Sequence, residues 1–429
     1  MSLALAPRLA RRNIHYGWVV VAVTFLTMLV TAGAMGSPGV LMLPLEKEFG
    51  WSTAEISTAL ALRILLFGLM APFAAAFLNR FGLRPVIVVA LALIVIGFLA
   101  SLAMTEYWQL IALWGVVLGF GTGLTAMVLA ATVATRWFTA RRGLVIGLLS
   151  ASNATGQLVF LPAIAKVTQQ FGWRPALVGM CVALCGTAGL VILLMRNYPA
   201  DLAQPPYGET TVVRPPATGT GLGSLLKTPI LALREAAQAP VFWVLFATFF
   251  VCGASTNGLV QTHFVTLCAD YGIAAVGAAS LLAVIGAFDL FGTIGSGWLS
   301  DRVDNRWLLF MYYGLRGLSL LALPFISFTF YGLSLFAVFY GLDWVATVPP
   351  TVKLTAERFG RDKAGLVFGW IFCGHQLGAA SAAFGAGLTR TALNTYLPAF
   401  FASGLLCLAA ALLALTLAKP RPKDALVPA

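Results

Sequence analysis

Long apolar stretches, separated by short polar or basic segments, dominate the pattern of residues along the chain. About 20 predominantly apolar residues are enough to cross a bilayer as an α-helix. Charged clusters and Pro/Gly positions divide the 429 residues into twelve such stretches. The pattern therefore predicts an all-α polytopic membrane protein with twelve transmembrane helices. They are expected at residues 16–38, 52–77, 85–104, 108–135, 142–165, 175–195, 240–264, 275–300, 307–328, 330–356, 364–389 and 395–418.

A polar segment rich in Pro, Thr and Gly separates the first six stretches from the last six. It is the longest polar part of the chain, so we interpret it as the boundary between two six-helix bundles. The expected organisation is a cytoplasmic N-terminal segment at 1–15, an N-terminal bundle at 16–196, a cytoplasmic linker at 197–239, a C-terminal bundle at 240–418 and a cytoplasmic tail at 419–429.

Composition and charge support a membrane protein and fix its expected orientation. Only 10% of the residues are charged, against about 25% in soluble domains, and 60% are hydrophobic. With the N-terminus inside, twenty of the 27 Lys and Arg residues fall in inner loops and four in outer loops. Because basic residues concentrate on the cytoplasmic side, both termini are expected there, in a plasma or inner membrane. The net charge of +12 is then a topology signal and not a nucleic-acid-binding patch.

A short motif occurs once in each half, between the second and third stretch of each six. Residues 75–84 read A-x-x-x-N-R-x-x-x-R, and residues 297–306 read G-x-x-x-D-R-x-x-x-R. A second echo follows the fourth stretch of each half, at 136–143 and 357–365. Two parallel six-helix repeats resemble the architecture of the major facilitator fold, which implies a substrate site near the midplane between the halves. An acid and arginines at cytoplasmic helix ends can form charge-assisted bonds that hold a gate closed. The expected gating residues are Arg80, Arg84, Asp301, Arg302 and Arg306.

These repeats resemble the major facilitator transporters, whose signature lies between helices 2 and 3. Three stretches resemble the monocarboxylate transporters and the bacterial oxalate/formate exchangers within that group: HYGWVVV at 15–21, WFxxRRGLxxG at 137–147 and FDLF at 288–291. The relatives carry an arginine one turn after the helix-8 acid, where this chain has Thr293, and many carry a lysine late in helix 1, which residues 34–38 lack. The resemblance implies a carrier of small organic anions whose anion-binding positions are filled differently.

Two charged residues midway along apolar stretches are the leading site candidates. A charge at the bilayer centre is costly, so each needs a partner or a water-filled cavity. Arg63 is the mid-span cation of the N-terminal half, and its guanidinium can bind a carboxylate through two parallel hydrogen bonds. Arg63 either binds the substrate or pairs with Glu55 or a helix-11 group. Asp289 is the candidate proton carrier, because desolvation favours its neutral form. Alternatively, Asp289 forms a fixed ion pair with Arg63 or Arg316.

Further polar residues inside the stretches complete the candidate site. Arg316 and Asp343 lie at similar depth in adjacent stretches, which predicts a structural ion pair within the C-terminal half. His375 and Gln376 lie between glycines and offer donors and acceptors to a ligand or to a neighbouring helix. The remaining substrate-binding candidates are uncharged: Asn153, Gln157 and Asn257.

Two proline-containing segments predict breaks in helices. Gly-Ser-Pro-Gly at 36–39 is expected to unwind the outer end of the first helix, and Pro349-Pro350 to kink the tenth. Such breaks suit a gate, although membrane helices also tolerate them for packing.

Taken together, these features favour a secondary active transporter that moves a small organic anion, a monocarboxylate in particular, by alternating access with proton symport. An organic-anion exchanger, an efflux carrier of another small amphiphile and a transport-incompetent receptor with this fold remain alternatives. An enzyme is disfavoured because the sequence has no clustered metal ligands, G-x-S-x-G motif or nucleotide motif. We expect no catalytic residue, cofactor or metal, a monomer, and the bilayer, protons and the anion as partners.

Overall fold

Helices account for nearly all of the regular structure. The computed structural model describes residues 6–7, 11–12, 14–125, 127–212, 222–300 and 302–417, in which no strand occurs beyond one isolated bridge between Phe138 and Tyr207. In the N-terminal half the elements are α2 (Gly17–Phe49), α3 (Thr53–Phe81), α4 (Leu83–Ser101), α5 (Tyr107–Leu110), η1 (Ile111–Val117), α6 (Leu118–Gly123), α7 (Met127–Trp137), α8 (Arg142–Phe171) and α9 (Trp173–Leu194). They are followed by η2 (Pro199–Leu202), α10 (Leu222–Ala236), α11 (Pro240–Gly253), η3 (Ala254–Gln261), α12 (Thr262–Asp270), α13 (Ala275–Ser300), α14 (Asn305–Ala322), η4 (Leu323–Phe325), α15 (Phe330–Asp343), α16 (Val348–Phe359), α17 (Arg361–Leu393) and α18 (Leu397–Leu415).

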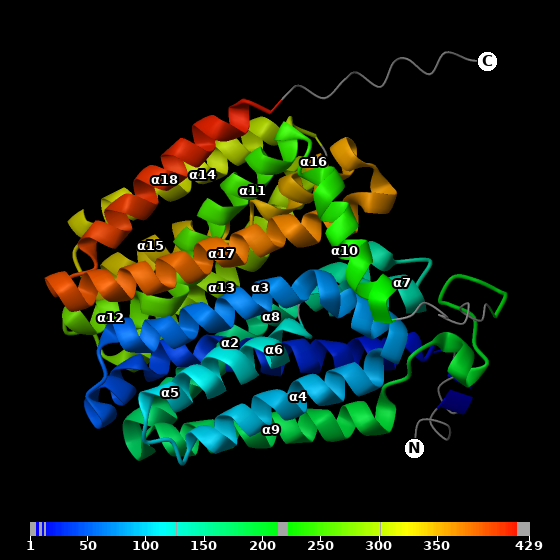
Figure 1. The fold of residues 1–429 in the computed structure, drawn as a ribbon, viewed down its shortest axis with the longest axis horizontal. Helices are drawn as coiled ribbons and strands as arrows, with labels where there is room; N and C mark the ends of the chain where they lie inside the picture. Colours follow the sequence, from blue (N-terminus) through cyan, green and yellow to red (C-terminus); the bar gives the residue numbers. More distant parts are fainter. Residues whose placement is uncertain are drawn as a thin grey trace.

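The helices form two groups that lie side by side (Figure 1). Helices α2–α9 make one group and α11–α18 the other. The groups meet through α3 against α17, α8 against α13, and α2 against α12. We call the end that carries the α2–α3 turn the outer end, because the distribution of Lys and Arg predicts this orientation. The predicted fold, an all-α polytopic membrane protein of two helix bundles, is confirmed.

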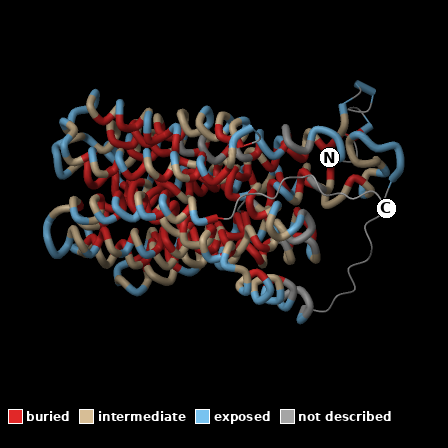
Figure 2. Tube along the Cα trace, turned by 90° about the horizontal axis from the view of Figure 1, so that it is seen from above, coloured by how far each residue is buried: buried red, intermediate tan, exposed pale blue. Residues whose placement is uncertain are grey.

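Burial follows the contacts between helices, while much of the outer surface is apolar. Buried residues run through the middle of the molecule, as Figure 2 shows. In contrast, large apolar side chains such as Phe291 and Val182 are 66% and 68% exposed. Eleven helical segments in the described residues are long and apolar enough to cross a membrane. The 30-residue α8 lies between them in sequence and corresponds to the predicted fifth span. An apolar exterior of this extent suits lipid as the surrounding solvent.

The first helix extends further than the sequence predicts. Residues 36–39 remain helical inside α2, which ends at Phe49, so the predicted unwinding is wrong. Neighbouring helices hold this segment: a Cβ on Gly39 would come within 2.8 Å of the carbonyl oxygen of Gln261. A Cβ on Gly36 would come within 2.9 Å of the Leu161 side chain. These glycines therefore serve close packing, and neighbouring helices allow proline inside a transmembrane helix.

The tenth predicted span is interrupted just before its prolines. Helix α15 ends at Asp343, residues 344–347 form turns, and α16 begins at Val348 with proline in its first turn. Proline is favoured there because the first turn of a helix leaves backbone N–H groups without intrahelical partners. The interruption leaves the N–H of Val345 available to a side chain on another helix.

The predicted linker contains an amphipathic helix. Helix α10 contacts α3 from one group and α17 from the other, at the end of the bundle opposite the outer end (Figure 1). The indole N–H of Trp370 on α17 donates to the carbonyl oxygen of Pro229 on α10 at 2.8 Å. The polar composition of residues 197–239 had indicated only a connection.

Candidate functional site

Arg63 lies in a small pocket between the two groups of helices. Leu60, Arg63 and Ile64 share one face of α3, because residues three and four apart lie on the same side of a helix. The enclosed space measures about 10 Å³, roughly what one water molecule needs. Residues from both groups line it: Met35, Gly36, Gly39, Leu60, Arg63, Ile64, Asn257, Gln261 and Thr262.

Arg63 is a buried cation with no counter-ion among the described residues. Arg63 is only 4% exposed. Neither its Nε nor its Nη1 has a hydrogen-bond partner among the described residues. The proposed alternative partner, Glu55, is occupied elsewhere. Its carboxylate accepts hydrogen bonds from the backbone N–H and the hydroxyl of Ser52, at 2.8 and 2.9 Å. This capping box fixes the start of α3 and leaves the guanidinium free for an anion.

The two predicted ligands on α17, His375 and Gln376, are not among the residues that line this pocket. Gln376 is 1% exposed and packs on α3, where a Cβ on Gly68 would overlap its side chain. Its Oε1 has no partner within the described part of the chain. His375 stacks on Phe372 and lies against Phe249, with ring centroids 5.6 and 4.9 Å apart. Gln376 therefore lies at the contact between the two groups, whereas the described ring contacts of His375 lie within the C-terminal group.

The three remaining predicted ligands are Asn257 on η3 and Asn153 and Gln157 on α8. Asn257 lines the pocket with Arg63, as the sequence suggested. It belongs to η3, a π-helical turn, and such turns occur often at functional sites. The side chains of Asn153 and Gln157 lie outside the described part of the structure.

Asp289 on α13 contacts uncharged groups. Its Oδ1 accepts hydrogen bonds from the Thr293 hydroxyl at 2.9 Å and from the backbone N–H of Val345 at 3.0 Å. Thr293, one turn after Asp289 on α13, thus binds its carboxylate. Asp289 also satisfies the backbone group freed by the interruption between α15 and α16.

Arg316 and Asp343 are in contact inside the C-terminal half. Arg316 Nε donates to Asp343 Oδ2 at 2.7 Å, and the side chains are 0% and 9% exposed. The remaining guanidinium nitrogens donate to the thiol sulfur of Cys252 at 3.0 Å and to the carbonyl oxygens of Asp343 and Trp344. With these acceptors Arg316 is fully engaged, so the described contacts leave Asp289 without a basic partner.

The motif arginines at the inner end contact groups close in sequence or within their own half. Arg306 binds Asp304 at 2.6 Å and the carbonyl oxygen of Leu417 at 3.0 Å. Arg302 donates to the carbonyl oxygen of Trp298, Arg80 lies over the ring of Phe81, and the backbone N–H of Arg84 donates to Asn197. Asp301 lies outside the described residues. The gating role of these five residues remains a prediction.

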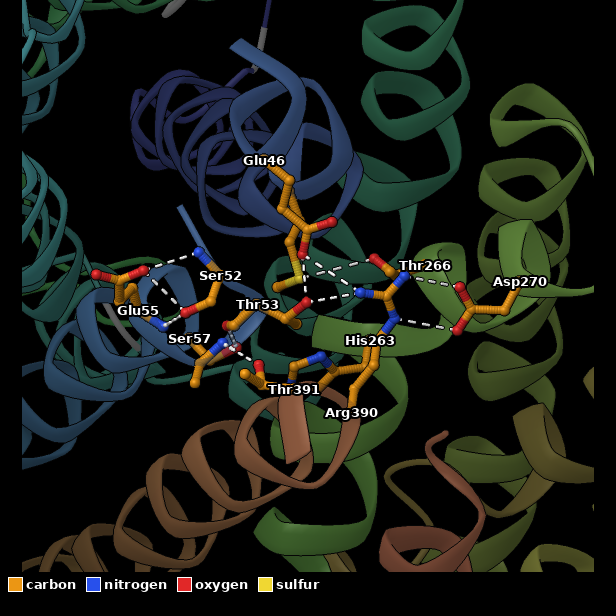
Figure 3. Close-up of polar contacts among 12 residues, drawn as sticks. Glu46, Ser52, Thr53, Glu55, Ser57, His263, Thr266, Asp270, Arg390 and Thr391 are labelled. Atoms are coloured by element: carbon orange, nitrogen blue, oxygen red, sulfur yellow. Dashed lines mark hydrogen bonds and ion pairs between the residues drawn. The ribbon is translucent and has the colours of Figure 1, made fainter. Parts of the chain in front are cut away.

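Sequence reasoning missed a polar cluster at the outer end (Figure 3). Arg390, near the end of α17, donates to Asp270 at 2.8 and 3.1 Å and to the hydroxyl of Thr53 at 2.8 Å. Glu46 lies 3.7 Å from the same guanidinium. From the sequence alone, Arg390 is only an outer-loop cation. Its partners lie in distant segments of the chain, so no local pattern indicated these contacts.

Comparisons with known proteins agree with this architecture. The sequence pattern of the Major Facilitator Superfamily matches residues 23–383. The MFS-type transporter YcxA of Bacillus subtilis is 24% identical over 385 residues, covering 89% of this chain and 90% of YcxA. Human monocarboxylate transporter 11 is 28% identical over 308 residues, covering 71% of this chain and 61% of that transporter. The solved D-xylose-proton symporter superposes with a TM-score of 0.72 at 16% identity, covering 94% of this chain and 98% of the symporter.

The chain therefore belongs to the Major Facilitator Superfamily. It is a multi-pass membrane transporter of that family, with monocarboxylate transporters among its distant relatives.

Proposed function

We propose that this protein is a secondary active transporter that moves a small monocarboxylate across the membrane by alternating access, together with a proton. One observation carries the proposal: Arg63 is buried, faces a pocket between the two groups of helices, and lacks a counter-ion among the described residues. A buried charge without a partner is strongly unfavourable, so an anionic ligand would relieve a cost that the empty protein bears.

Once the two groups separate and widen the space beside Arg63, its surroundings suit a ligand with one carboxylate and a short apolar remainder. A guanidinium can hold a carboxylate through two parallel hydrogen bonds. Met35, Leu60 and Ile64 offer apolar contacts, whereas the amide of Asn257 offers a donor and an acceptor. The pocket has a single cation among its lining residues, which favours one negative charge on the ligand. The names of the monocarboxylate transporter relatives agree with this class.

Charge balance supports proton symport. Arg316 and Asp343 neutralise each other, and Lys353 lies nearer the inner end of the tenth span, where it donates to the carbonyl oxygen of Ser300. Among the described mid-span residues, Arg63 and Asp289 are then the charges that the transport cycle must balance. In the empty carrier their charges cancel if Asp289 is ionised. When a carboxylate binds Arg63, the charge is again balanced only if Asp289 takes up a proton. Both states then cross the membrane without moving net charge, which avoids the penalty of an uncompensated charge in the bilayer.

The contacts of Asp289 offer a link between the proton and a change of shape. Its carboxylate binds the Val345 N–H at the interruption between α15 and α16. A hydrogen bond to an ionised acceptor is stronger than one to a neutral carboxylic acid. Protonation therefore weakens this contact and frees the interrupted tenth span to bend. At the inner end, Arg80, Arg84, Asp301, Arg302 and Arg306 are proposed to act as the gate that such bending releases.

The test is uptake of radiolabelled lactate, pyruvate and related carboxylates by proteoliposomes under an inward proton gradient. We expect gradient-driven uptake of one acid by the wild type. Arg63→Gln should abolish uptake, and Arg63→Lys should retain part of it, because lysine keeps the charge but not the two parallel donors. Asp289→Asn should bind the acid but lose coupling to the proton gradient, since its amide oxygen can still accept from Val345.

A matched control is Arg174→Gln. Arg174 forms an exposed ion pair with Glu48 at 2.6 Å, outside the pocket, and its replacement should leave uptake unchanged. If a correctly folded wild type takes up no carboxylate, the monocarboxylate proposal is wrong. If Asp289→Asn still accumulates the acid against its gradient, Asp289 is not the proton carrier.

A further inference from the structure

Arg390 connects the two groups of helices at the outer end. It lies on α17, in the C-terminal group, between Asp270 of the same group and Thr53 and Glu46 of the N-terminal group (Figure 3). Thr53 in turn donates its hydroxyl hydrogen to Glu46, so the acceptors from α2 and α3 form one unit. The cluster therefore spans the boundary that must open in an alternating-access cycle.

The three nitrogens of the Arg390 guanidinium donate to two different partners, one in each group of helices. Nε and Nη2 donate to the two carboxylate oxygens of Asp270 at 3.1 and 2.8 Å. This bidentate arrangement fixes the plane of the guanidinium. The remaining nitrogen, Nη1, then points to the other group and donates to Thr53 at 2.8 Å. Asp270 thus orients Arg390, and the bond across the boundary is made to Thr53 and Glu46.

Other contacts between α3 and α17 surround this bond. The backbone N–H of Ala54 donates to the Thr391 hydroxyl at 3.1 Å, again across the boundary. One turn below Arg390, a Cβ on Gly387 would overlap the Ser57 hydroxyl. Helices α3 and α17 are therefore in close contact at this point. Arg63 lies ten residues after Thr53 on α3, or about 15 Å further into the membrane.

We propose that Arg390, oriented by Asp270, is the outer gate of the carrier and holds the path to Arg63 closed by binding Thr53 and Glu46. This inference rests on the proposed alternating-access function. The Arg390 side chain remains 23% exposed, so water can replace its partners when the two groups separate. Partly exposed ion pairs contribute little each, which makes the closure reversible.

The experiment measures closure directly, without a substrate. Ala54→Cys and Thr391→Cys, introduced together with Cys185→Ser to remove the exposed native thiol, place one thiol on each side of the boundary. Disulfide formation in membrane vesicles under mild oxidant reports how often the outer end is closed. Adding Arg390→Gln should slow this cross-linking about two- to fivefold. It should also speed labelling of the two thiols by a membrane-impermeant maleimide.

Two further variants make the result specific. The pair Glu46→Gln with Thr53→Val removes the negative charge and the hydroxyl acceptor across the boundary, keeps the Arg390–Asp270 contact, and should slow cross-linking similarly. Arg174→Gln removes another outer-end ion pair, which stays within the N-terminal group, and should leave the rate unchanged. Monodispersity in detergent verifies folding of each variant. Unchanged cross-linking in both the Arg390→Gln and Glu46→Gln/Thr53→Val proteins would overturn the proposal.

The two proposals fail in different ways. If no carboxylate is transported but cross-linking responds as described, the gate stands and the substrate assignment falls. If uptake depends on Arg63 but cross-linking is unchanged by Arg390→Gln, the gate proposal is wrong and the transporter proposal is retained.

Discussion

The buried pair of Arg316 and Asp343 allows a quantitative test of what holds the C-terminal half together. Removing one member leaves the other charge buried without compensation, which typically costs about 3–5 kcal/mol. The cost of Arg316→Met should lie near the upper end of this range, because the Asp343 carboxylate then loses its ion-pair partner. Its Oδ1 already has no partner among the described residues. Asp343→Leu should lie near the lower end, because two carbonyl oxygens and the Cys252 sulfur still accept from Arg316.

The double variant Arg316→Met/Asp343→Leu separates a structural role from a role in transport. Replacing both members of a buried pair by apolar residues is often neutral or stabilising. The double variant should therefore recover the Tm that each single variant loses, measured by thermal unfolding in detergent. It should also recover proton-driven uptake, because neither residue takes part in the proposed charge balance.

The comparison uses Arg174→Gln as the surface reference. The Arg174–Glu48 side chains are 44% and 37% exposed, and an exposed pair contributes about 0–1 kcal/mol. The reasoning is refuted if the single variants at Arg316 and Asp343 lower Tm no more than Arg174→Gln does. A stable double variant that has lost uptake would instead place the pair in the transport cycle.

Three further outcomes follow from the contacts described. Gly292→Ala should lower Tm and reduce the free energy of unfolding by about 1–3 kcal/mol, because the added Cβ would overlap the carbonyl oxygen of Leu342. On the same helix, the Cβ added by Gly295→Ala meets open space, so this control should leave Tm unchanged. Trp370→Phe removes the hydrogen bond to Pro229 and should weaken the attachment of α10 to α17 by about 0.5–1.5 kcal/mol. Limited proteolysis should then cut α10 faster. Uptake should be insensitive to a membrane potential imposed with potassium and valinomycin; a strong dependence would contradict the proposed charge balance.

The fold could be predicted from the sequence because lipid imposes simple rules on it. Apolar length gives the helices and the Lys/Arg distribution suggests their orientation. Boundaries were less accurate: α2 runs eleven residues beyond its predicted end at residue 38, since packing against η3 and α8 tolerates Pro38. The π-helical turn η3 also shifts the helical period, so periodicity alone could not orient Asn257.

The candidate site was only partly accessible to sequence reasoning. Arg63 was found because a mid-span cation is conspicuous, and the S-x-x-E pattern of Ser52 and Glu55 already contained the signal that Glu55 caps a helix. The contact between Asp289 and Val345 depends on where the tenth span is interrupted, which Pro349 and Pro350 indicate only approximately. The partners of Arg390 lie 120 and 337 residues away, beyond any local pattern.

The Arg63 guanidinium, which has no counter-ion in the described part of the chain, bears on the kinetics of the cycle. In the empty carrier the Arg63 charge is balanced by Asp289, whose described contacts are with Thr293 and Val345, whereas in the loaded carrier it is balanced by the cargo in direct contact with the guanidinium. The return of the unloaded protein is then the slowest leg. A carboxylate waiting on the far side would bypass that leg, so exchange of labelled for unlabelled acid should run faster than net accumulation.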